Sequence, residues 1–221
     1  MNLSEQTLSM LGTGIWETLF MTFVSSFLAY VIGIPLGICL VVSSKDGIKP
    51  MPPVNVILGI IINILRSIPF IILLIMVLPL TRLMVGTTLG AKAVIPPLVI
   101  AAAPYIARMV ESSLKEVDAG VIEAAKSMGA SNFQIVWKVL LPEATPSLLL
   151  GAAISITTIL GYSAMAGFTG GGGLGTIAIN YGYYRYQTDV MLITVAILVI
   201  IVQIIQETWM FLSRSGDKRI R

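Results

Sequence analysis

The segment Gly170-Gly-Gly-Gly-Leu-Gly175 has the glycine content of a phosphate-binding loop. Glycine-rich turns bind phosphates where a strand leads into a helix, and a P-loop ends with lysine followed by serine or threonine. No such ending follows here, and no strand is expected before the segment. We therefore predict a turn or a flexible re-entrant connection between membrane spans, in which glycine supplies unusual backbone angles.

Few other residues could carry out chemistry. Cys39 is the single cysteine and the chain has no histidine, so neither a disulfide nor a Cys/His metal site can form. Glu111, Glu143 and Glu207 fall towards the ends of apolar stretches, which argues against a proton relay at the membrane midplane. Without a Walker motif, the chain cannot hydrolyse ATP by the P-loop route. We predict no catalytic residue, no metal, no cofactor and no enzyme activity of its own.

The composition of the chain indicates that most of its helices lie in lipid. The chain of 221 residues is 56% hydrophobic and only 11% charged, whereas soluble domains contain about 25% charged residues. A transmembrane helix needs roughly 20 mostly apolar residues. We predict an all-α membrane protein with five transmembrane helices, at Leu19–Val42, Ile61–Leu80, Ala93–Glu111, Ser147–Phe168 and Val190–Leu212.

The basic residues are distributed unevenly about these spans. One side receives Lys45, Lys49, Arg108, Lys115, Lys126, Lys138, Arg214, Lys218, Arg219 and Arg221. The other side receives only Arg82, Lys92 and Arg185. By the positive-inside rule, residues 1–18 are extracytoplasmic and residues 213–221 form a basic cytoplasmic tail. The same rule explains the basic charge without a nucleic-acid partner.

Arg66 is the awkward charge of the predicted second span. A second helix beginning at Ile61 places it a few residues inside the cytoplasmic end. We expect its side chain to reach the headgroups by snorkelling, with a buried polar partner as the alternative. Pro69 follows three residues later and should kink this helix or begin its regular part.

A hydrophilic loop, residues 112–146, separates the third span from the fourth. Asp118 can cap the N-terminus of a short helix that ends at Gly129. Ser131 and Gln134 form a possible capping box for a second short helix, on which Phe133 and Trp137 recur at helical spacing. This pair is too polar to cross the bilayer. It could lie at the headgroups as an amphipathic connector or dock in a groove of a soluble partner.

The loop resembles the EAA loop of binding-protein-dependent ABC importer permeases. The likeness rests on Glu123-Ala124-Ala125, on Gly129 four residues later, and on Leu141-Pro142, while Val139 stands where the family usually has Ile. Four further stretches are similar to the methionine importer permeases, so that the likeness covers nearly the whole chain. They are Arg66-Ser-Ile-Pro-Phe-Ile-Ile-Leu73, Pro79-Leu-Thr-Arg82, Val85-Gly-Thr-Thr88 and Gly161-Tyr-Ser-Ala-Met-Ala-Gly167.

The resemblance implies a permease subunit that carries methionine, including the D-enantiomer in some members, across the bacterial cytoplasmic membrane. Residues 19–212 would be a type-1 ABC transporter transmembrane domain, and loop 112–146 would hold the coupling helix. The implied partners are two ATPase subunits, an extracytoplasmic substrate-binding lipoprotein that contacts residues 170–186, a second copy of the chain and lipid. The implied ATPase-coupling residues are Glu123, Ala124, Ala125, Gly129, Phe133, Leu141 and Pro142.

The substrate pathway is predicted on the fourth span, where Tyr162, Ser163 and Met165 lie close together. Met165 is a candidate gate residue, although flexible methionine also serves as ordinary packing in an apolar helix. Two other kinds of protein fit the composition. One is a channel or carrier driven by an ion gradient, and the other is a membrane scaffold that uses the loop to recruit a soluble protein.

Overall fold

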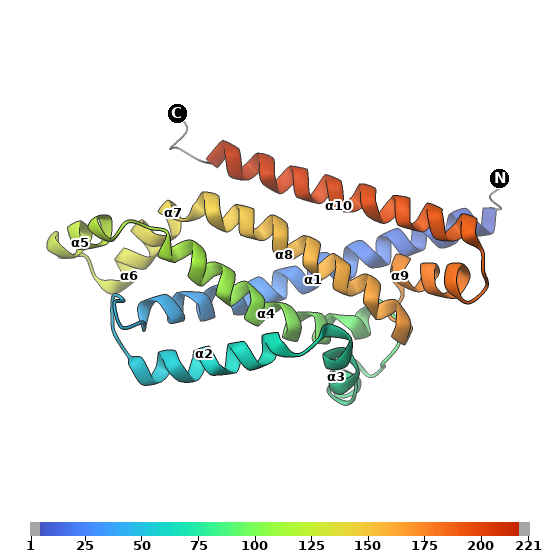
Figure 1. Cartoon of the computed structure of the whole chain (residues 1–221), viewed down its shortest axis with the longest axis horizontal. Helices are drawn as coiled ribbons and strands as arrows, with labels where there is room; N and C mark the ends of the chain where they lie inside the picture. The colour runs from blue at the N-terminus through green and yellow to red at the C-terminus, as the bar shows by residue number, and fades with distance from the viewer. Residues whose placement is uncertain (1–4, 217–221) are drawn as a thin grey trace. The chain divides into compact units, whose positions relative to one another are not determined.

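The computed structural model of the chain describes residues 5–216, and every regular element in that range is a helix (Figure 1). Four of the helices in this range are long and apolar enough to cross a membrane. They are α1 (Glu5–Val42), α4 (Ala91–Lys115), α8 (Thr145–Met165) and α10 (Thr188–Gly216). Each contains or closely matches a predicted span, so the all-α membrane fold is confirmed.

The predicted span Ile61–Leu80 is wrong in its details. The structure has two helices there, α2 (Pro52–Ser67) and α3 (Phe70–Val85), which meet the length requirement for a span only as a pair. The break falls at Pro69, which cannot donate a backbone hydrogen bond, and α3 begins directly after it as expected. The described residues thus contain four spans, or five if the bent pair counts as one.

Short helices fill the two connections on either side of α8. Between α4 and α8 lie α5 (Ala119–Ser127), α6 (Asn132–Ile135), a π-helical turn (Val136–Leu140) and α7 (Leu141–Glu143). Between α8 and α10 lie a 3₁₀ turn (Ala166–Thr169), α9 (Gly173–Ile177) and a π-helical turn (Ala178–Tyr183). Gly170–Gly172 form the turn expected of the glycine-rich segment, with positive φ at Gly170 and Gly172, and Gly173–Gly175 begin α9.

The chain divides into two compact units. The first comprises residues 5–28, 68–102 and 156–206. Its core is formed by Leu11 of α1 with Leu174 and Ile177 of α9, and apolar residues of α10 pack against it. The glycine segment is thus a buried part of this unit.

The second unit comprises residues 29–67, 103–155 and 207–216. Leu40 of α1, Ile62 of α2 and Ala107 of α4 form its core. A Cβ at Gly37 would lie only 2.6 Å from the carbonyl oxygen of Ala107, so glycine lets α1 and α4 approach closely. Asn55 of α2 donates to the Leu40 carbonyl at 2.7 Å, which adds a polar tie between these apolar helices.

The first and last helices extend beyond the predicted spans, and the predicted sides of the two ends stay predictions. Residues 5–18, predicted as an extracytoplasmic segment, form the first part of α1. Of the predicted basic tail 213–221, Ser213 and Arg214 belong to α10. The basic residues Lys218, Arg219 and Arg221 lie outside the described residues.

Candidate functional site: the α5–α6 helix pair and the end of α8

The first helix of the loop begins as predicted. Asp118 precedes α5, and its carboxylate accepts a hydrogen bond from the Gly120 amide at 2.7 Å. The first amides of any helix lack partners within the helix, so a carboxylate here stabilises the start of α5. The cap lies within the loop itself.

The end of α5 explains why Gly129 is a glycine. The Ala130 amide donates to the Ala125 carbonyl at 3.1 Å, and the Gly129 amide donates to the Lys126 carbonyl at 2.9 Å. These two bonds form a Schellman motif, in which the residue at the position of Gly129 is left-handed. Its φ is +81°, a conformation that side chains with a Cβ rarely adopt. The predicted helix end is confirmed.

The second helix starts two residues after Gly129 with the predicted capping box. The Gln134 amide donates to Ser131 Oγ at 3.3 Å, and the Ser131 amide donates to Gln134 Oε1 at 2.8 Å. Residues of the turn therefore make the hydrogen bonds of the free backbone groups at the end of α5 and at the start of α6. The two short helices need no partner to complete the hydrogen bonds of this turn.

Buried and exposed side chains separate cleanly on the pair. Ala125, Ile135 and Leu140 are buried and hold the pair against the rest of its unit. The opposite face, called here the outer face, is exposed and consists of Val121, Glu123, Ala124, Met128, Phe133 and Trp137. The Glu-Ala-Ala triplet is thus divided, because its first two residues face outwards and its third faces inwards.

The outer face carries an ordered aromatic pair. Phe133 and Trp137 lie one helical turn apart, and their rings stack with centroids 6.2 Å apart and planes within 4°. Their exposed fractions are 74% and 62%, and that of Met128 is 81%. Large exposed apolar groups beside charged residues are typical of an interaction surface.

Leu141 and Pro142 lie where the loop joins α8. Pro142 is exposed and Leu141 is half-buried. Proline cannot donate to the carbonyl four residues earlier, and a wider π-helical turn precedes it, in which the Leu141 amide donates to the Val136 carbonyl. Leu141 and Pro142 therefore belong to the connection between the loop and α8, and they are not part of the outer face.

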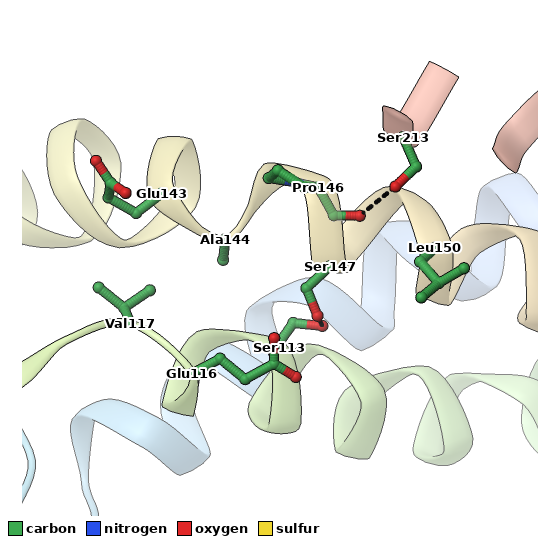
Figure 2. Close-up of a pocket in the computed structure, with 9 residues that line it drawn as sticks. All are labelled: Ser113, Glu116, Val117, Glu143, Ala144, Pro146, Ser147, Leu150 and Ser213. Carbon is green, nitrogen blue, oxygen red and sulfur yellow. Dashed lines mark hydrogen bonds between the residues drawn. The ribbon is translucent and has the colours of Figure 1, made fainter. Parts of the chain in front are cut away.

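A cavity of about 300 Å³ lies beside this connection (Figure 2). Ser147 Oγ donates to Ser113 Oγ at 3.0 Å, and Ser213 Oγ donates to the Pro146 carbonyl at 2.8 Å, so the ends of α4, α8 and α10 are joined by single hydrogen bonds. A second cavity of about 260 Å³ lies against α5, lined in part by Asp46 and Ile122. Flanked by cavities, the loop has room to shift against its unit.

The predicted pathway residues point in different directions. The Tyr162 ring stacks on Phe70 of α3, with centroids 4.6 Å apart and planes within 5°. Ser163 is buried and donates to the Leu160 carbonyl at 2.7 Å, whereas Met165 is 47% exposed. The structure therefore does not bring all three to one surface. Of the three, Met165 is the one whose side chain is largely exposed, and the pathway role of all three stays a prediction.

Two residues missed by the sequence reasoning hold the glycine segment. Glu17 Oε2 accepts from the Gly173 amide at 2.6 Å, and Thr18 Oγ1 accepts from the Leu174 amide at 2.9 Å. Together these α1 side chains cap the N-terminus of α9. Neither was foreseen, because the partners are 156 residues apart in sequence and no local pattern connects them.

A second missed feature is an ion-pair network on α4. Arg108 and Lys115 both contact Glu111, at 2.6 and 2.7 Å. Arg108 also donates to the Gly59 carbonyl at 3.1 Å and to Asn63 Oδ1 at 3.0 Å, so it ties α4 to α2. The spacing of Arg108 and Glu111 along one helix could have revealed the pair.

Comparisons with known proteins agree with this geometry. The family described as "Binding-protein-dependent transport system inner membrane component" matches residues 29–211. The probable D-methionine transport system permease protein MetI of Vibrio cholerae is 47% identical over 95% of this chain and 93% of that protein. The D-methionine transport system permease protein MetI of Escherichia coli K12 is 51% identical over 75% of this chain and 76% of that protein.

A solved structure shares both the fold and the sequence. A chain of the MetNI methionine ABC transporter in an inward-facing conformation is 48% identical, with a TM-score of 0.96. The match covers 97% of this chain and all of that one. Neither an ion-gradient carrier nor a scaffold finds support among these comparisons.

Proposed function

Because this chain belongs to the binding-protein-dependent transport system inner membrane component family, we propose that it is the permease subunit of an ATP-driven methionine importer. Its relatives are named for D-methionine transport, so the proposed substrate includes the D-enantiomer. ATP hydrolysis belongs to a separate subunit, and this chain supplies the multi-pass inner-membrane part. The family match over residues 29–211 supports residues 19–212 as the type-1 transmembrane domain.

The outer face of α5 and α6 carries this proposal. It offers Glu123 and Ala124 beside the stacked Phe133 and Trp137, on a helix pair whose turn is capped from within. Such a face fits the helix-in-groove mode of recognition, in which an amphipathic helix enters a groove of its partner. The proposed partner is the cytoplasmic ATPase, with one ATPase subunit for each of two permease copies related by a twofold axis.

The opposite side of the membrane would receive the substrate-binding lipoprotein. In the proposed orientation the N-terminus is extracytoplasmic and the C-terminus is cytoplasmic. The connection between α9 and α10 then faces outwards and presents Tyr183, Tyr184 and Tyr186, which are 63%, 61% and 86% exposed. Exposed tyrosines are enriched at protein interfaces, which supports contact of residues 170–186 with the lipoprotein.

The proposed mechanism is alternating access driven by the ATPase. Closure of the ATPase dimer displaces the α5–α6 pair, and α4 and α8 receive this displacement because they flank the loop. ATP acts on the permease only if the two permease conformations fit the closed ATPase dimer differently. The cavities beside the loop give the pair space for such a shift. Met165, exposed at the end of α8, is the proposed gate residue.

The test is Phe133→Ala in the chain co-expressed with its ATPase. Phe133 is 74% exposed, so its removal should leave the fold intact while removing an aromatic contact. We expect at least about a tenfold weaker association with the ATPase, since buried aromatic anchors contribute about 2 kcal/mol or more to an interface. Co-purification and ATP-dependent methionine uptake into proteoliposomes that contain the binding protein measure the loss.

Phe27→Ala is the matched control, because Phe27 is similarly exposed at 69% but lies within the apolar helix α1. It should bind the ATPase as the unchanged protein does. Equal assembly and uptake for both variants and the unchanged chain would show that the outer face does not couple transport to ATP hydrolysis.

A further inference from the structure

Arg66 lies in the last turn of α2, at the end remote from the predicted cytoplasmic boundary. It stands fourteen positions after Pro52, the first residue of α2, which is about 21 Å along an α-helix. Its guanidinium carbon lies 5.9 Å from the ring centroid of Tyr105, which is itself near the centre of α4. α2 starts nine residues before the predicted span, so Arg66 lies farther along its helix than the snorkelling expectation assumed, and that expectation stays a prediction.

The face of α2 that carries Arg66 is polar, and its first part packs against α1 and α4. Asn55, Gly59, Asn63 and Arg66 recur at helical spacing and form one stripe. The first three contact α1 or α4, through Asn55 to the Leu40 carbonyl and through Arg108 to the other two. The opposite face of α2 is exposed and apolar, and it consists of Val54, Ile57, Ile61 and Ile64. Lipid should cover that face, so Arg66 does not point to lipid.

Both neutral and charged groups lie near Arg66 in the second unit. Tyr105 of α4 lies under the guanidinium, and a hydrogen bond joins Tyr30 of α1 to Ser155 of α8. Within residues 5–216, the two ion pairs join Arg108 and Lys115 to Glu111, and neither involves Arg66. Arg66 is exposed as well. Arg66 is thus a basic group without a carboxylate partner in the described part of the chain.

A charge within a membrane span normally faces a water-filled path or a binding partner, because lipid cannot solvate it. Arginine presents a planar set of donors that matches a carboxylate in two parallel hydrogen bonds. We propose that the guanidinium of Arg66 binds the α-carboxylate of the amino-acid substrate during its passage through the permease. This inference rests on the proposed function and adds a residue that recognises the substrate.

The Tyr105 ring can orient the Arg66 side chain before the substrate carboxylate binds, and it leaves the guanidinium free to release that carboxylate. A cation over a tyrosine ring is attracted weakly, so the contact orients the Arg66 side chain without neutralising it. A carboxylate can therefore engage the donors on the guanidinium edge. Passage requires binding weak enough for release. Arg108 lies three residues after Tyr105 on α4, but it is paired with Glu111, whereas the described residues offer Arg66 no carboxylate.

The first test compares Arg66→Gln with Arg66→Lys in the complete transporter reconstituted in proteoliposomes. We expect Arg66→Gln to lower ATP-dependent methionine uptake at least tenfold and Arg66→Lys to retain most of it, because lysine keeps the charge. Arg82→Gln is the control, since Arg82 is an exposed arginine in the last turn of α3. It should transport as the unchanged chain does.

The outcomes separate this inference from the proposed function. No methionine uptake by the unchanged transporter would overturn the proposed function itself. Normal uptake by Arg66→Gln, beside an active unchanged transporter, would overturn only the role of Arg66. Assembly with the ATPase is measured on each preparation. Arg66→Gln could also lose assembly with the ATPase while Arg66→Lys keeps it. If the NMR test below then shows no contact with the carboxylate, Arg66 has a structural role and the inference is overturned.

The second test observes the contact directly in the folded transporter. Methionine labelled with ¹³C at its carboxylate is added to the complex in lipid nanodiscs, with ¹⁵N in the arginine guanidinium groups. Solid-state NMR should detect a ¹³C–¹⁵N dipolar contact in the unchanged complex that disappears in Arg66→Lys. A contact that is absent, or that persists unchanged in Arg66→Lys, would overturn the inference.

Discussion

The two connections that flank α8 contain similar structural features but differ in which residues cap their helices. Each contains short helices and glycines with positive φ, such as Gly129 in one and Gly172 in the other. In the α5–α6 pair, both caps at the turn and the cap at Asp118 come from residues at most five positions apart. In the α9 segment, the N-terminal cap comes from Glu17 and Thr18 of a distant helix.

The difference in burial follows the difference in capping. Gly173, Leu174, Gly175 and Ile177 of α9 are buried, so its amides depend on side chains that other helices bring to them. The α5–α6 pair leaves its large apolar residues exposed and satisfies its turn locally. One connection is therefore part of the folded core, whereas the other keeps its shape through its own residues and leaves its apolar side chains exposed.

The largest expected effect is from Gly175→Ala. A Cβ at this position would overlap the carbonyl oxygen of Ala164 and lie 2.7 Å from its Cα, and backbone cannot move aside as a flexible side chain can. We expect a loss of about 3 kcal/mol or more of stability, at the upper end for overpacking. The yield of folded protein and its thermal unfolding in detergent measure this loss.

Gly161→Ala is the control for this first variant. Gly161 lies in α8, and a Cβ there would meet nothing within 4 Å. Its stability should match that of the unchanged chain. If Gly175→Ala is equally stable, α9 does not pack as closely on α8 as the contrast between the two connections requires.

A smaller effect is expected from Glu17→Ala, which removes the remote cap of α9. The Gly173 amide would lose a charged acceptor at 2.6 Å, at a cost of about 1–3 kcal/mol. Hydrogen exchange of the amides of residues 173–177 should become faster. Glu17→Gln keeps an oxygen acceptor and should show a weaker effect, while Glu5→Ala, an exposed glutamate of the same helix, should leave these amides unchanged.

Equal exchange for Glu17→Ala and Glu5→Ala would contradict this account. It would mean that the α9 segment does not depend on α1 for its N-terminal hydrogen bonds. The contrast with the locally capped α5–α6 pair would then disappear.

Local features of this molecule could be predicted from the sequence. Asp118, Gly129 and the Ser131–Gln134 box were found because each depends on residues a few positions apart, and hydropathy alone located α1, α4, α8 and α10. The likeness to importer permeases identified the family. The roles of the coupling residues remain predictions.

Features that depend on distant segments could not be predicted. The capping of α9 by Glu17 requires knowledge of which helix lies beside it. The predicted position of Arg66 within its helix was wrong because a single span of about 20 residues was assumed, whereas the chain uses two shorter helices broken at Pro69. The contacts of the polar stripe of α2 could not be predicted without knowing that α1 and α4 pack against it.

The smallest expected effect on folding, with a clear effect on transport, comes from Gly129→Ala. The residue has φ +81° and open space around a Cβ, so the cost is conformational and not steric, about 1 kcal/mol. It should loosen the turn between α5 and α6 and lower ATP-dependent uptake, while thermal unfolding of the whole chain hardly changes. Hydrogen exchange at Ala130 and the last turn of α5 reports the loosening.

Gly129→Asn is the discriminating variant, because asparagine adopts this conformation more readily than alanine and should restore much of the uptake. If alanine and asparagine behave alike, the Schellman turn does not set the shape of the outer face, and the locally capped connection loses the feature that separates it from α9.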